Sequence, residues 1–473
     1  MGILGLFWLD RDSRSRVSGA LWIPSIWFLL ACSRPLSAWW NLGEIQKESV
    51  APVSALLSEG SPIDRAVYTG LLVLGLIVLA QRRDITLKTV RSCWPVALFF
   101  GYCLLSLLWS DFADVAFKRW TKAVGDWVMV MIIWTDPNPL AALKRLIART
   151  AYIVIPVSIL FMKYFGDIGR SYDYLGFVHY SGVTREKNTL GSLCLLFGLA
   201  ATWAIINLWR DKRPSRLRQL TVQIVILGMI LWMFTILDAM TSLSCFLLAQ
   251  MVLLVSRFKM MKKNRATIHC LIAVAIVVPV SVAILGLSPG AIQQLGRNPT
   301  LTDRTGIWEG VIRITPNPLV GAGFESFWMG PRLERIVAEV THWWYPNQAH
   351  SGYIETYANL GWVGLTCLGV VILWGYGRII DIWRRNQPEG NLMLAWFIAG
   401  VIYNLTEAAF FRMMIPIWLF LLIAITVPRA SAKVPRRDTS VKLSKEAQTP
   451  EVMIHEKEPA NMLARYGAGT AAP

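Results

Sequence analysis

The chain has 473 residues, of which 55% are hydrophobic and only 16% are charged, and its mean hydropathy is +0.46. Soluble globular proteins average about 25% charged residues, so this composition excludes a disordered chain, a coiled coil and an ordinary soluble enzyme. The formal net charge is +17, and the positions of the cations decide whether it signals nucleic-acid binding or membrane topology. The sequence predicts an all-α polytopic membrane protein.

Apolar runs long enough to cross a bilayer recur along the chain. We predict about twelve transmembrane helices, at 17–33, 66–80, 93–109, 123–135, 146–165, 189–209, 220–237, 241–256, 267–287, 352–376, 391–411 and 413–428. Residues 1–16 form a cytoplasmic N-terminus, 17–287 hold the first nine spans and 352–428 the last three. Residues 429–473 are rich in Pro, Lys, Glu, Thr and Ala without periodicity, which predicts a disordered cytoplasmic tail.

The distribution of cations orients these spans. If the N-terminus is cytoplasmic, the inner segments carry 31 of the 47 Lys and Arg residues, as the positive-inside rule requires. The net charge is therefore mostly a topology signal, and we expect no nucleic-acid partner. One alternative stays open, because Leu29-Leu30-Ala31-Cys32 resembles a lipoprotein cleavage site and loss of the first helix would leave the later topology unchanged.

Two outer segments are unusually long, at about 164–188 and 288–351. Loops of this length are usually either functional or disordered, and their content of aromatic residues and Gly favours ordered, functional segments. The larger loop holds five Arg and five acidic residues, so an anion site there depends on the placement of single side chains. Arg304 follows Thr302-Asp303 at the start of a predicted helix at 306–312, a position that suits phosphate. The alternative is a capped helix with a surface Arg–Glu pair.

Histidine and tryptophan gather at the end of the larger loop, where the chain re-enters the membrane. His350 lies where a ligand with a lipid tail and a polar head would be found, and an imidazole can act as a general base near neutral pH; the alternative is a structural histidine. Trp344 stands between Trp343 and Tyr345. This aromatic run is either an interfacial belt or a platform for sugar stacking, and the sequence leaves both open.

Further polar residues lie at the outer ends of predicted spans. Arg185, Lys187 and Asn188 precede the span at 189–209 on the outside, where positive flanks are disfavoured, so we expect a functional role. Glu407 falls within the span at 391–411 near its outer end, and an intramembrane carboxylate is a functional candidate; alternatively it pairs with an outer-loop Arg. No metal-binding motif appears outside, and we expect no metal site.

Together these features resemble the bacterial O-antigen ligase and polysaccharide polymerase superfamily, over nearly all the chain except the tail. The residues that carry the resemblance are Lys187-Asn188, Arg304, Pro316 to Gly323, Gln348-Ala349-His350-Ser351-Gly352-Tyr353 and Asn359 to Leu365. The stretches Leu108 to Phe112, Asp126 and Asn404-Leu405-Thr406-Glu407 resemble its exopolysaccharide polymerase branch, of the succinoglycan type. The chain departs from the usual pattern where Thr302-Asp303-Arg304 replaces Ser-Gly-Arg, His350-Ser351 replaces His-Asn and Arg185-Glu186 replaces a Gly-His-type pair.

The resemblance implies glycosyl transfer at the periplasmic face of the bacterial inner membrane. The donor would be an oligosaccharide on undecaprenyl diphosphate, transferred with inversion and without a metal or other cofactor. His350 would take the proton of the attacking hydroxyl, and Arg304 and Arg185, with Lys187, would stabilise the leaving diphosphate. The resemblance places the remaining candidates in substrate binding: Asn188, Gln348, Tyr353, Trp344 and Glu407.

Three functions fit these expectations. The first is a polymerase that joins lipid-linked repeat units into exopolysaccharide, with the growing polysaccharide as acceptor and a chain-length regulator as a possible partner. The second is a ligase that moves a finished glycan to a lipid A core or another acceptor. The third is a transporter or flippase, a class that usually shows two similar halves. The chain shows no such repeat.

Overall fold

The fold was analysed in a computed structural model, which describes residues 2–11, 16–40, 61–172, 176–258, 260–261, 265–285, 301–342 and 344–428. The predicted tail at 429–473, the last two residues of the predicted span at 267–287 and residues 288–300 of the large loop lie outside the described residues.

Helices dominate the first part of the chain up to residue 164. They are α1 (Gly2–Leu9), η1 (Gly19–Leu21), α2 (Trp22–Ala31), α3 (Leu36–Trp40), α5 (Pro62–Gln81), α6 (Arg83–Ser92), α7 (Trp94–Leu105), η3 (Ser106–Trp109), α8 (Ala113–Trp134) and α9 (Pro139–Tyr164). A short helix and a two-stranded hairpin follow, namely α10 (Gly166–Gly169), β1 (Arg170–Tyr172) and β2 (Val178–Tyr180). The strands are antiparallel, with Arg170 opposite Tyr180. The described residues of the predicted outer segment at 164–188 thus include paired strands.

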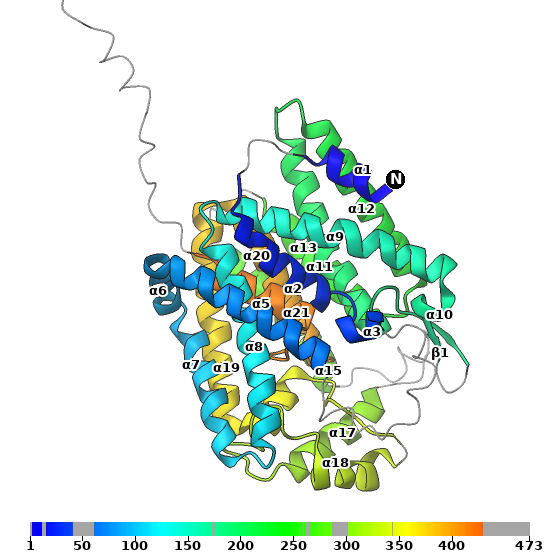
Figure 1. The fold of residues 1–473 in the computed structure, drawn as a ribbon, viewed down its shortest axis with the longest axis vertical. Coiled ribbons are helices and arrows are strands. Elements are labelled where there is room, and N and C mark those ends of the chain that lie inside the picture. Colours follow the sequence, from blue (N-terminus) through cyan, green and yellow to red (C-terminus); the bar gives the residue numbers. More distant parts are fainter. Residues whose placement is uncertain are drawn as a thin grey trace, which may run out of the picture. The chain divides into compact units, whose positions relative to one another are not determined.

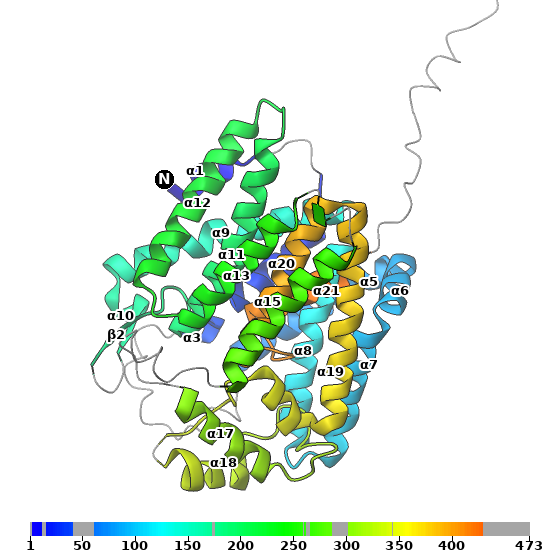
Figure 2. The same cartoon turned by 180° about the vertical axis from the view of Figure 1, so that it is seen from behind.

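The second part returns to helices. They are α11 (Lys187–Trp209), α12 (Arg216–Ile236), α13 (Met240–Val255), α15 (Arg265–Leu285), α17 (Leu301–Ile314), α18 (Gly330–Ile336), the π-helical turn η4 (Val337–Thr341), α19 (Gly352–Arg385), α20 (Gln387–Tyr403) and α21 (Pro416–Thr426). Figures 1 and 2 show α20 and α21 in the middle of the bundle, where they pack against α11, α19 and each other.

Each of the twelve predicted spans contains a helix, but twelve spans are not confirmed. Five helices of the described chain are long and apolar enough to cross a membrane: α5, α9, α11, α12 and α19. A sixth span is possible if α6 and the helical segment Trp94–Trp109, which are bent by 83° relative to each other, together count as one span. Others are short: α21 has 11 residues, all buried. Such helices are apolar on all sides because neighbouring helices surround them. Several apolar helices indicate a multi-pass membrane protein.

Two of the segments that carry the family resemblance, Pro316 to Gly323 and Asn359 to Leu365, pack against each other. Gly361 has φ +63°, which breaks α19, and a side chain on Gly361 would lie 2.3 Å from the backbone of Leu319. The chain before Gly323 fills this break, since the amides of Trp362 and Val363 donate to the carbonyls of Pro318 and Leu319, at 2.9 and 3.0 Å. Glycine is needed here because no other residue combines this conformation with this approach. The break places the first turns of α19 beside the large loop.

The described part of the large loop predicted at 288–351 has its own apolar core. Ile307 and Val311 of α17, Leu333 of α18, and Phe327 and Trp328 between these helices are buried together. The cluster continues onto Ala349, just before α19, and Ala358 within it, so α17 packs against α19 and α18 packs against α17 (Figure 1). The described residues of this loop are therefore ordered, as the composition predicts.

The segment between the last two helices differs from the sequence prediction. The span expected at 391–411 ends at Tyr403, and the span expected at 413–428 begins at Pro416. Asn404 stops the helix because its side-chain Oδ1 accepts the amides of Ala409 and Phe410, at 2.8 and 2.9 Å. The prediction of Glu407 within a helical span is therefore wrong: Glu407 lies in the non-helical connection at 404–415.

Candidate active site

Three of the residues singled out from the sequence meet at the carboxylate of a fourth, Glu407. Oε1 of Glu407 lies 3.3 Å from Nη2 of Arg304 and accepts Nδ2 of Asn188 at 3.1 Å. Oε2 of the same carboxylate lies 3.4 Å from Nδ1 of His350. These groups come from α17, the start of α11, the loop before α19 and the 404–415 connection. Glu407 is only 5% exposed, so its charge is balanced mainly by Arg304.

Close backbone contact joins the His350 loop to the Glu407 segment. The amide of Gly352 donates to the carbonyls of Asn404 and Glu407, at 2.8 and 3.1 Å. A side chain at Gly352 would lie 2.0 Å from Oδ1 of Asn404. Glycine is therefore required for this approach. The run from His350 to Gly352 and the run from Asn404 to Glu407 make one structural unit.

His350 has an unusual backbone and a ring fixed on one side. Its φ is +50°, a conformation that non-glycine residues adopt rarely and that is concentrated at functional sites. Nδ1 faces Glu407, whereas Nε2 makes no hydrogen bond with any residue that the structure describes. The side chain is 24% exposed. If Nδ1 carries the proton toward Glu407, Nε2 is the basic nitrogen, which is the arrangement of a carboxylate-oriented general base.

Arg304 lies in the first turn of α17, as expected for a residue at a helix start. Its guanidinium reaches away from that helix, donating Nη1 to the carbonyl of Thr406 and pairing through Nη2 with Glu407. The partner carboxylate is thus about a hundred positions away in the sequence and is buried, so the surface Arg–Glu pair considered for the sequence does not describe it. The other alternative considered for the sequence, in which Glu407 pairs with an Arg of the large loop, does describe this contact.

The two other predicted cations do not contact Glu407. Lys187, the first residue of α11, pairs with Asp238 at 3.3 Å and lies 3.4 Å from Nδ1 of His179. Arg185 has an exposed side chain and makes no hydrogen bond or ion pair within the part of the chain that the structure describes. The loop that carries Arg185 is held against α9, where the amide of Val183 donates to Ser158 at 3.3 Å. Arg185 is therefore an available cation on a fixed backbone.

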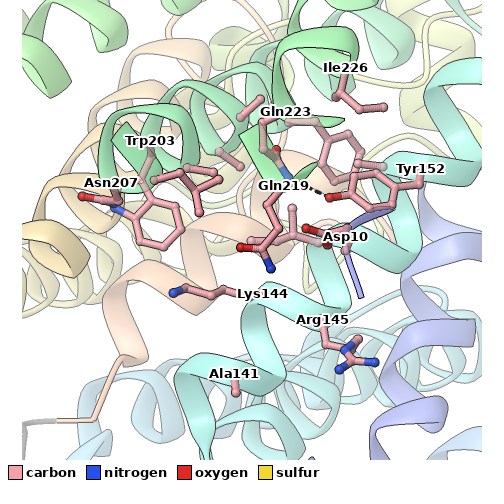
Figure 3. A pocket seen from close by; sticks show the side chains of 18 of the residues that line it. Asp10, Ala141, Lys144, Arg145, Tyr152, Trp203, Asn207, Gln219, Gln223 and Ile226 are labelled. Atoms are coloured by element: carbon pink, nitrogen blue, oxygen red, sulfur yellow. Dashed lines mark hydrogen bonds between the residues drawn. The ribbon is translucent and has the colours of Figure 1, made fainter. Parts of the chain in front are cut away.

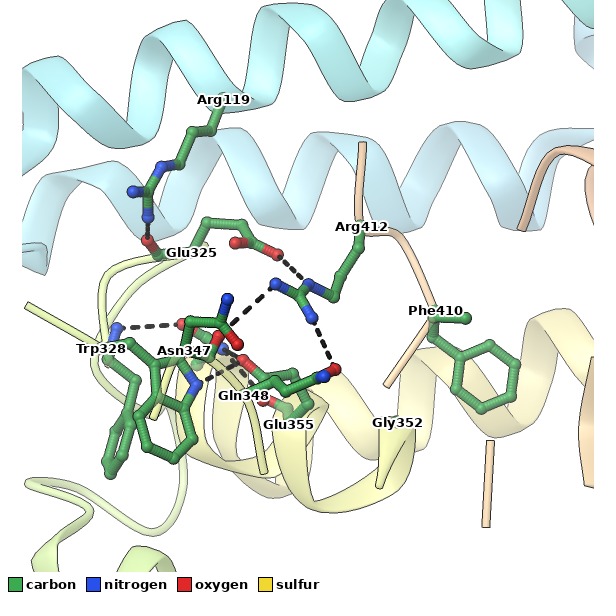
Figure 4. A network of polar contacts seen from close by, with 12 residues as sticks. Arg119, Glu325, Trp328, Asn347, Gln348, Gly352, Glu355, Phe410 and Arg412 are labelled. Carbon is green, nitrogen blue, oxygen red and sulfur yellow. Dashed lines mark hydrogen bonds and ion pairs between the residues drawn. The ribbon is translucent and has the colours of Figure 1, made fainter. Parts of the chain in front are cut away.

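Arg412 holds the chain just before His350, as Figure 4 shows. Its Nη1 donates to Oε1 of Gln348 at 2.8 Å, its Nη2 donates to the carbonyl of Asn347 at 3.4 Å, and its Nε lies 4.0 Å from Glu325. Arg119 of α8 donates to the backbone carbonyl of Glu325. Gln348, predicted to bind substrate, thus has a protein partner.

Glu355 supports the same loop from the other side (Figure 4). Its Oε1 accepts Nε1 of Trp328 at 2.7 Å and Nδ2 of Asn359 at 3.1 Å, and its Oε2 accepts the amide of Ala349 at 2.8 Å. This carboxylate is 4% exposed. It fixes the residue immediately before His350.

Two other predicted substrate contacts face the protein interior. The hydroxyl of Tyr353 donates to the carbonyl of Val401 at 3.1 Å, and its ring meets Phe410 edge-on with centroids 5.1 Å apart. Trp344 packs against the apolar cluster of the large loop. Sugar stacking by Trp344 stays a prediction.

Sequence reasoning did not assign roles to Arg412, Glu355 or Asn404. Glu355 and Asn404 are polar residues inside apolar runs, which is a usable signal because such groups require partners when buried. Arg412 gave a weaker signal, a cation at the predicted outer end of a span. No group of three or more His, Cys, Asp or Glu side chains among the described residues could hold a metal ion.

A separate cavity of about 350 Å³ lies between α9, α11 and α12 (Figure 3). Lys144, Arg145 and Trp203 line it, and Nε2 of Gln223 donates to the hydroxyl of Tyr152 there at 2.6 Å. None of the residues predicted for the site lines this cavity.

Residues 239–369 match the family model described as O-Antigen ligase. This match confirms the resemblance to the O-antigen ligase and polymerase superfamily. The matched region includes Arg304 and His350 and ends before Glu407. This resemblance implies a glycosyltransferase-like enzyme that acts at a membrane. A comparison with curated proteins found no match.

Proposed function

We propose that the protein polymerises oligosaccharide repeat units carried on undecaprenyl diphosphate, at the periplasmic face of the bacterial inner membrane. The observation that carries this proposal is the convergence of His350, Arg304 and Asn188 on the buried carboxylate of Glu407. A histidine oriented by a carboxylate is suited to remove a proton from a sugar hydroxyl.

In the proposed reaction the acceptor hydroxyl oxygen attacks the anomeric carbon of the donor sugar. The bond from that carbon to the diphosphate oxygen breaks, and the lipid diphosphate leaves with the electron pair. Nε2 of His350 takes the hydroxyl proton, and Glu407 stabilises the resulting imidazolium through Nδ1. Attack opposite the leaving group inverts the anomeric centre. No metal or other cofactor takes part in this scheme.

The cations have different parts in this proposal. Arg304 is ion-paired with Glu407 and bonded to Thr406, so its first task is to orient the carboxylate. Lys187 shares its charge with Asp238. Arg185 has no such partner among the described residues, and we assign it the main contact with the leaving diphosphate.

A ligase that passes a finished glycan to another acceptor is the second candidate, because it would use the same chemistry. The polymerase is favoured by the residues that resemble the exopolysaccharide branch. Asp126 accepts the amide of Met414 at 3.0 Å, and Asn404 accepts those of Ala409 and Phe410. Both therefore shape the connection that carries Glu407. A transporter would not need a carboxylate-oriented histidine.

The glycan profile of a deletion strain tests the proposal. The strain is complemented with wild type, His350→Ala or the control His342→Ala, an exposed histidine in the same loop. We expect long polymer to disappear in the deletion and the His350→Ala strain, while single repeat units persist on the lipid. Full-length polymer accumulating on undecaprenyl diphosphate without reaching an acceptor would instead establish the ligase. Normal polymer in the His350→Ala strain would contradict both.

A further inference from the structure

The cavity between α9, α11 and α12 has a polar end and an apolar end. Arg145 near the start of α9, Asn207 in the last turn of α11 and Gln219 in the first turn of α12 line the polar end. Phe197 and Ile226 line the cavity roughly 10 Å or more further along α11 and α12. Figure 3 shows Arg145 and Ile226 on opposite sides of the space. All three helices are long and apolar enough to cross a membrane, so a ligand here meets polar groups at the helix ends and apolar groups deeper in the bundle.

The polar end holds hydrogen-bond donors that the described residues leave unused. Nδ2 of Asn207 is buried and has no hydrogen-bond partner among the residues that the structure describes. Gln219 is 7% exposed, and its side-chain amide makes no hydrogen bond within the same ranges. Buried polar groups in folded proteins nearly always have partners. Unused N–H groups gathered at one end of a cavity therefore indicate a ligand that brings oxygen acceptors.

The two carboxylates on the lining are engaged by other groups. Asp211 accepts Nε of Arg213 at 2.6 Å. Asp10, directly after α1, is hydrogen-bonded to the hydroxyl of Tyr152. Both carboxylates therefore have partners other than Arg145.

Arg145 lacks an opposite charge within the part of the chain that the structure describes, where it forms no hydrogen bond or ion pair. The charge of Lys144 beside it acts on the carboxylate of Glu389. Arg145 is instead close enough to Arg149, one turn further along α9, for the two cations to repel each other. An anion beside Arg145 would offset this repulsion, and a guanidinium group binds phosphate oxygens through paired N–H donors.

Exposed tryptophans mark the level of the polar end. Trp8, just before Asp10, is 65% exposed, and Trp209, just after Asn207, is 72% exposed. Tryptophan is enriched where a membrane meets water, and the sequence predicts that this end of the bundle faces the cytoplasm. We therefore expect the polar end of the cavity at the level of the lipid headgroups and the apolar end beside the acyl chains. This placement favours a lipid over a soluble phosphate compound as the occupant.

We infer that this cavity binds an anionic phospholipid, with its phosphate at Arg145, Asn207 and Gln219 and the start of an acyl chain along Phe197 and Ile226. Basic pockets between membrane helices on the cytoplasmic side suit anionic headgroups. The volume of about 350 Å³ lies at the lower end of the range for small-molecule sites, which suits a headgroup rather than a whole lipid. The inference is independent of the proposed function, because none of the residues that converge on the carboxylate of the candidate active site lines this cavity.

Three variants separate a phosphate site from a general effect of charge or structure. Arg145→Gln removes the unpaired cation without removing a described contact. Asn207→Leu replaces an unpartnered donor by an apolar group of similar size, so the melting temperature of the free protein should not fall. Arg218→Gln is the matched control, because Arg218 is an exposed cation beside Gln219 that does not line the cavity.

Binding is measured on the full-length, delipidated protein in detergent, with phosphatidylglycerol, phosphatidylcholine and glycerol 3-phosphate as separate probes. We expect Arg145→Gln to weaken the binding of phosphatidylglycerol at least about tenfold, the loss typical of a charge-assisted contact. Asn207→Leu should weaken it by a smaller factor, while Arg218→Gln and His350→Ala should bind as wild type. Phosphatidylcholine should bind more weakly because its choline cancels the charge of the headgroup, and glycerol 3-phosphate because it has no chain for the apolar end.

Unchanged affinity for phosphatidylglycerol in Arg145→Gln, or an equal loss in Arg218→Gln, would overturn the inference. Equal affinity of wild type for phosphatidylcholine would show that the cavity does not select an anionic headgroup and would also overturn it. If glycerol 3-phosphate binds as tightly as phosphatidylglycerol and requires Arg145, the lipid is overturned as the source of the phosphate.

Discussion

Two buried carboxylates flank His350, and their surroundings differ. Glu355 accepts only neutral donors, from Trp328, Asn359 and the amide of Ala349. Glu407 is paired with a cation, Arg304, and faces the imidazole of His350. The exposed fractions are nearly equal, at 4% and 5%. Glu355 and Glu407 therefore differ in the chemistry of their partners and not in their burial.

The difference separates a supporting group from a reacting one. Neutral donors fix a carboxylate in place and leave it no partner that can exchange a proton during a reaction. A histidine partner has a charge that changes when it takes a proton, and the carboxylate beside it stabilises that change. We therefore assign Glu355 to the shape of the loop before His350 and Glu407 to its chemistry.

The largest loss of turnover is expected when His350, the proposed general base, is removed. His350→Ala should lower the turnover of lipid-linked substrate by about 10²- to 10⁴-fold, the usual contribution of a general base, while the protein still reaches the membrane. Turnover of purified protein measures this, with His342→Ala as the control. Turnover within a few-fold of wild type would exclude His350 as the base.

Glu407→Gln should come next, with a loss of about 10²-fold in kcat. The amide keeps the shape of the side chain but carries no charge to stabilise a protonated His350. The bond from Arg304 to the Thr406 carbonyl is retained, so the unfolding transition should move less than the rate. Steady-state kinetics and a thermal melt of the same preparation compare the two. A lower melting temperature with unchanged kcat would reverse our assignment.

Glu355→Gln should act on stability instead. One of its three donors would face the new amide group and lose its acceptor, which costs about 1–3 kcal/mol for a buried group. We expect a lower melting temperature and, for the folded fraction, kcat within a few-fold of wild type. A loss of kcat comparable with that of Glu407→Gln, at full stability, would show that the two carboxylates do not differ as proposed.

Trp328→Phe should have the smallest effect. It removes a single neutral donor from Glu355 and keeps most of the apolar packing, so about 1 kcal/mol of stability should be lost. Glu355 retains Asn359 and Ala349. Denaturant unfolding monitored by a probe of the large loop measures the change, and kcat should not move. An effect as large as that of Glu355→Gln would mean that Trp328 alone holds the carboxylate.

Much of the helical framework could be predicted from the sequence, because apolar runs mark helices regardless of what covers them. The number of spans could not, since a helix such as α21 is apolar because other helices surround it. The end of α20 was also missed, because it depends on the side chain of Asn404 folding back onto residues 409 and 410.

The candidate site was found in part for a related reason. Asn188, His350 and Glu407 each stood out as polar residues at the outer end of apolar runs, Arg304 stood out at the start of a predicted helix in the large loop, and the four converge. Arg412 carried a similar signal, a cation at the predicted outer end of a span, but a single residue without a motif gave no reason to select it. The contacts of Arg412 to Asn347 and Gln348 join segments far apart in the chain, which periodicity and composition do not reveal.

The central claim, that His350 and Glu407 act as one unit, is tested most directly by a double-mutant cycle. Turnover is measured for His350→Ala, Glu407→Gln and the combination. Residues that work as a unit are strongly non-additive, so Glu407→Gln should lower the residual rate of His350→Ala by less than about twofold. Multiplication of the two single losses in the double variant would show that Glu407 acts independently of His350 and would contradict the account.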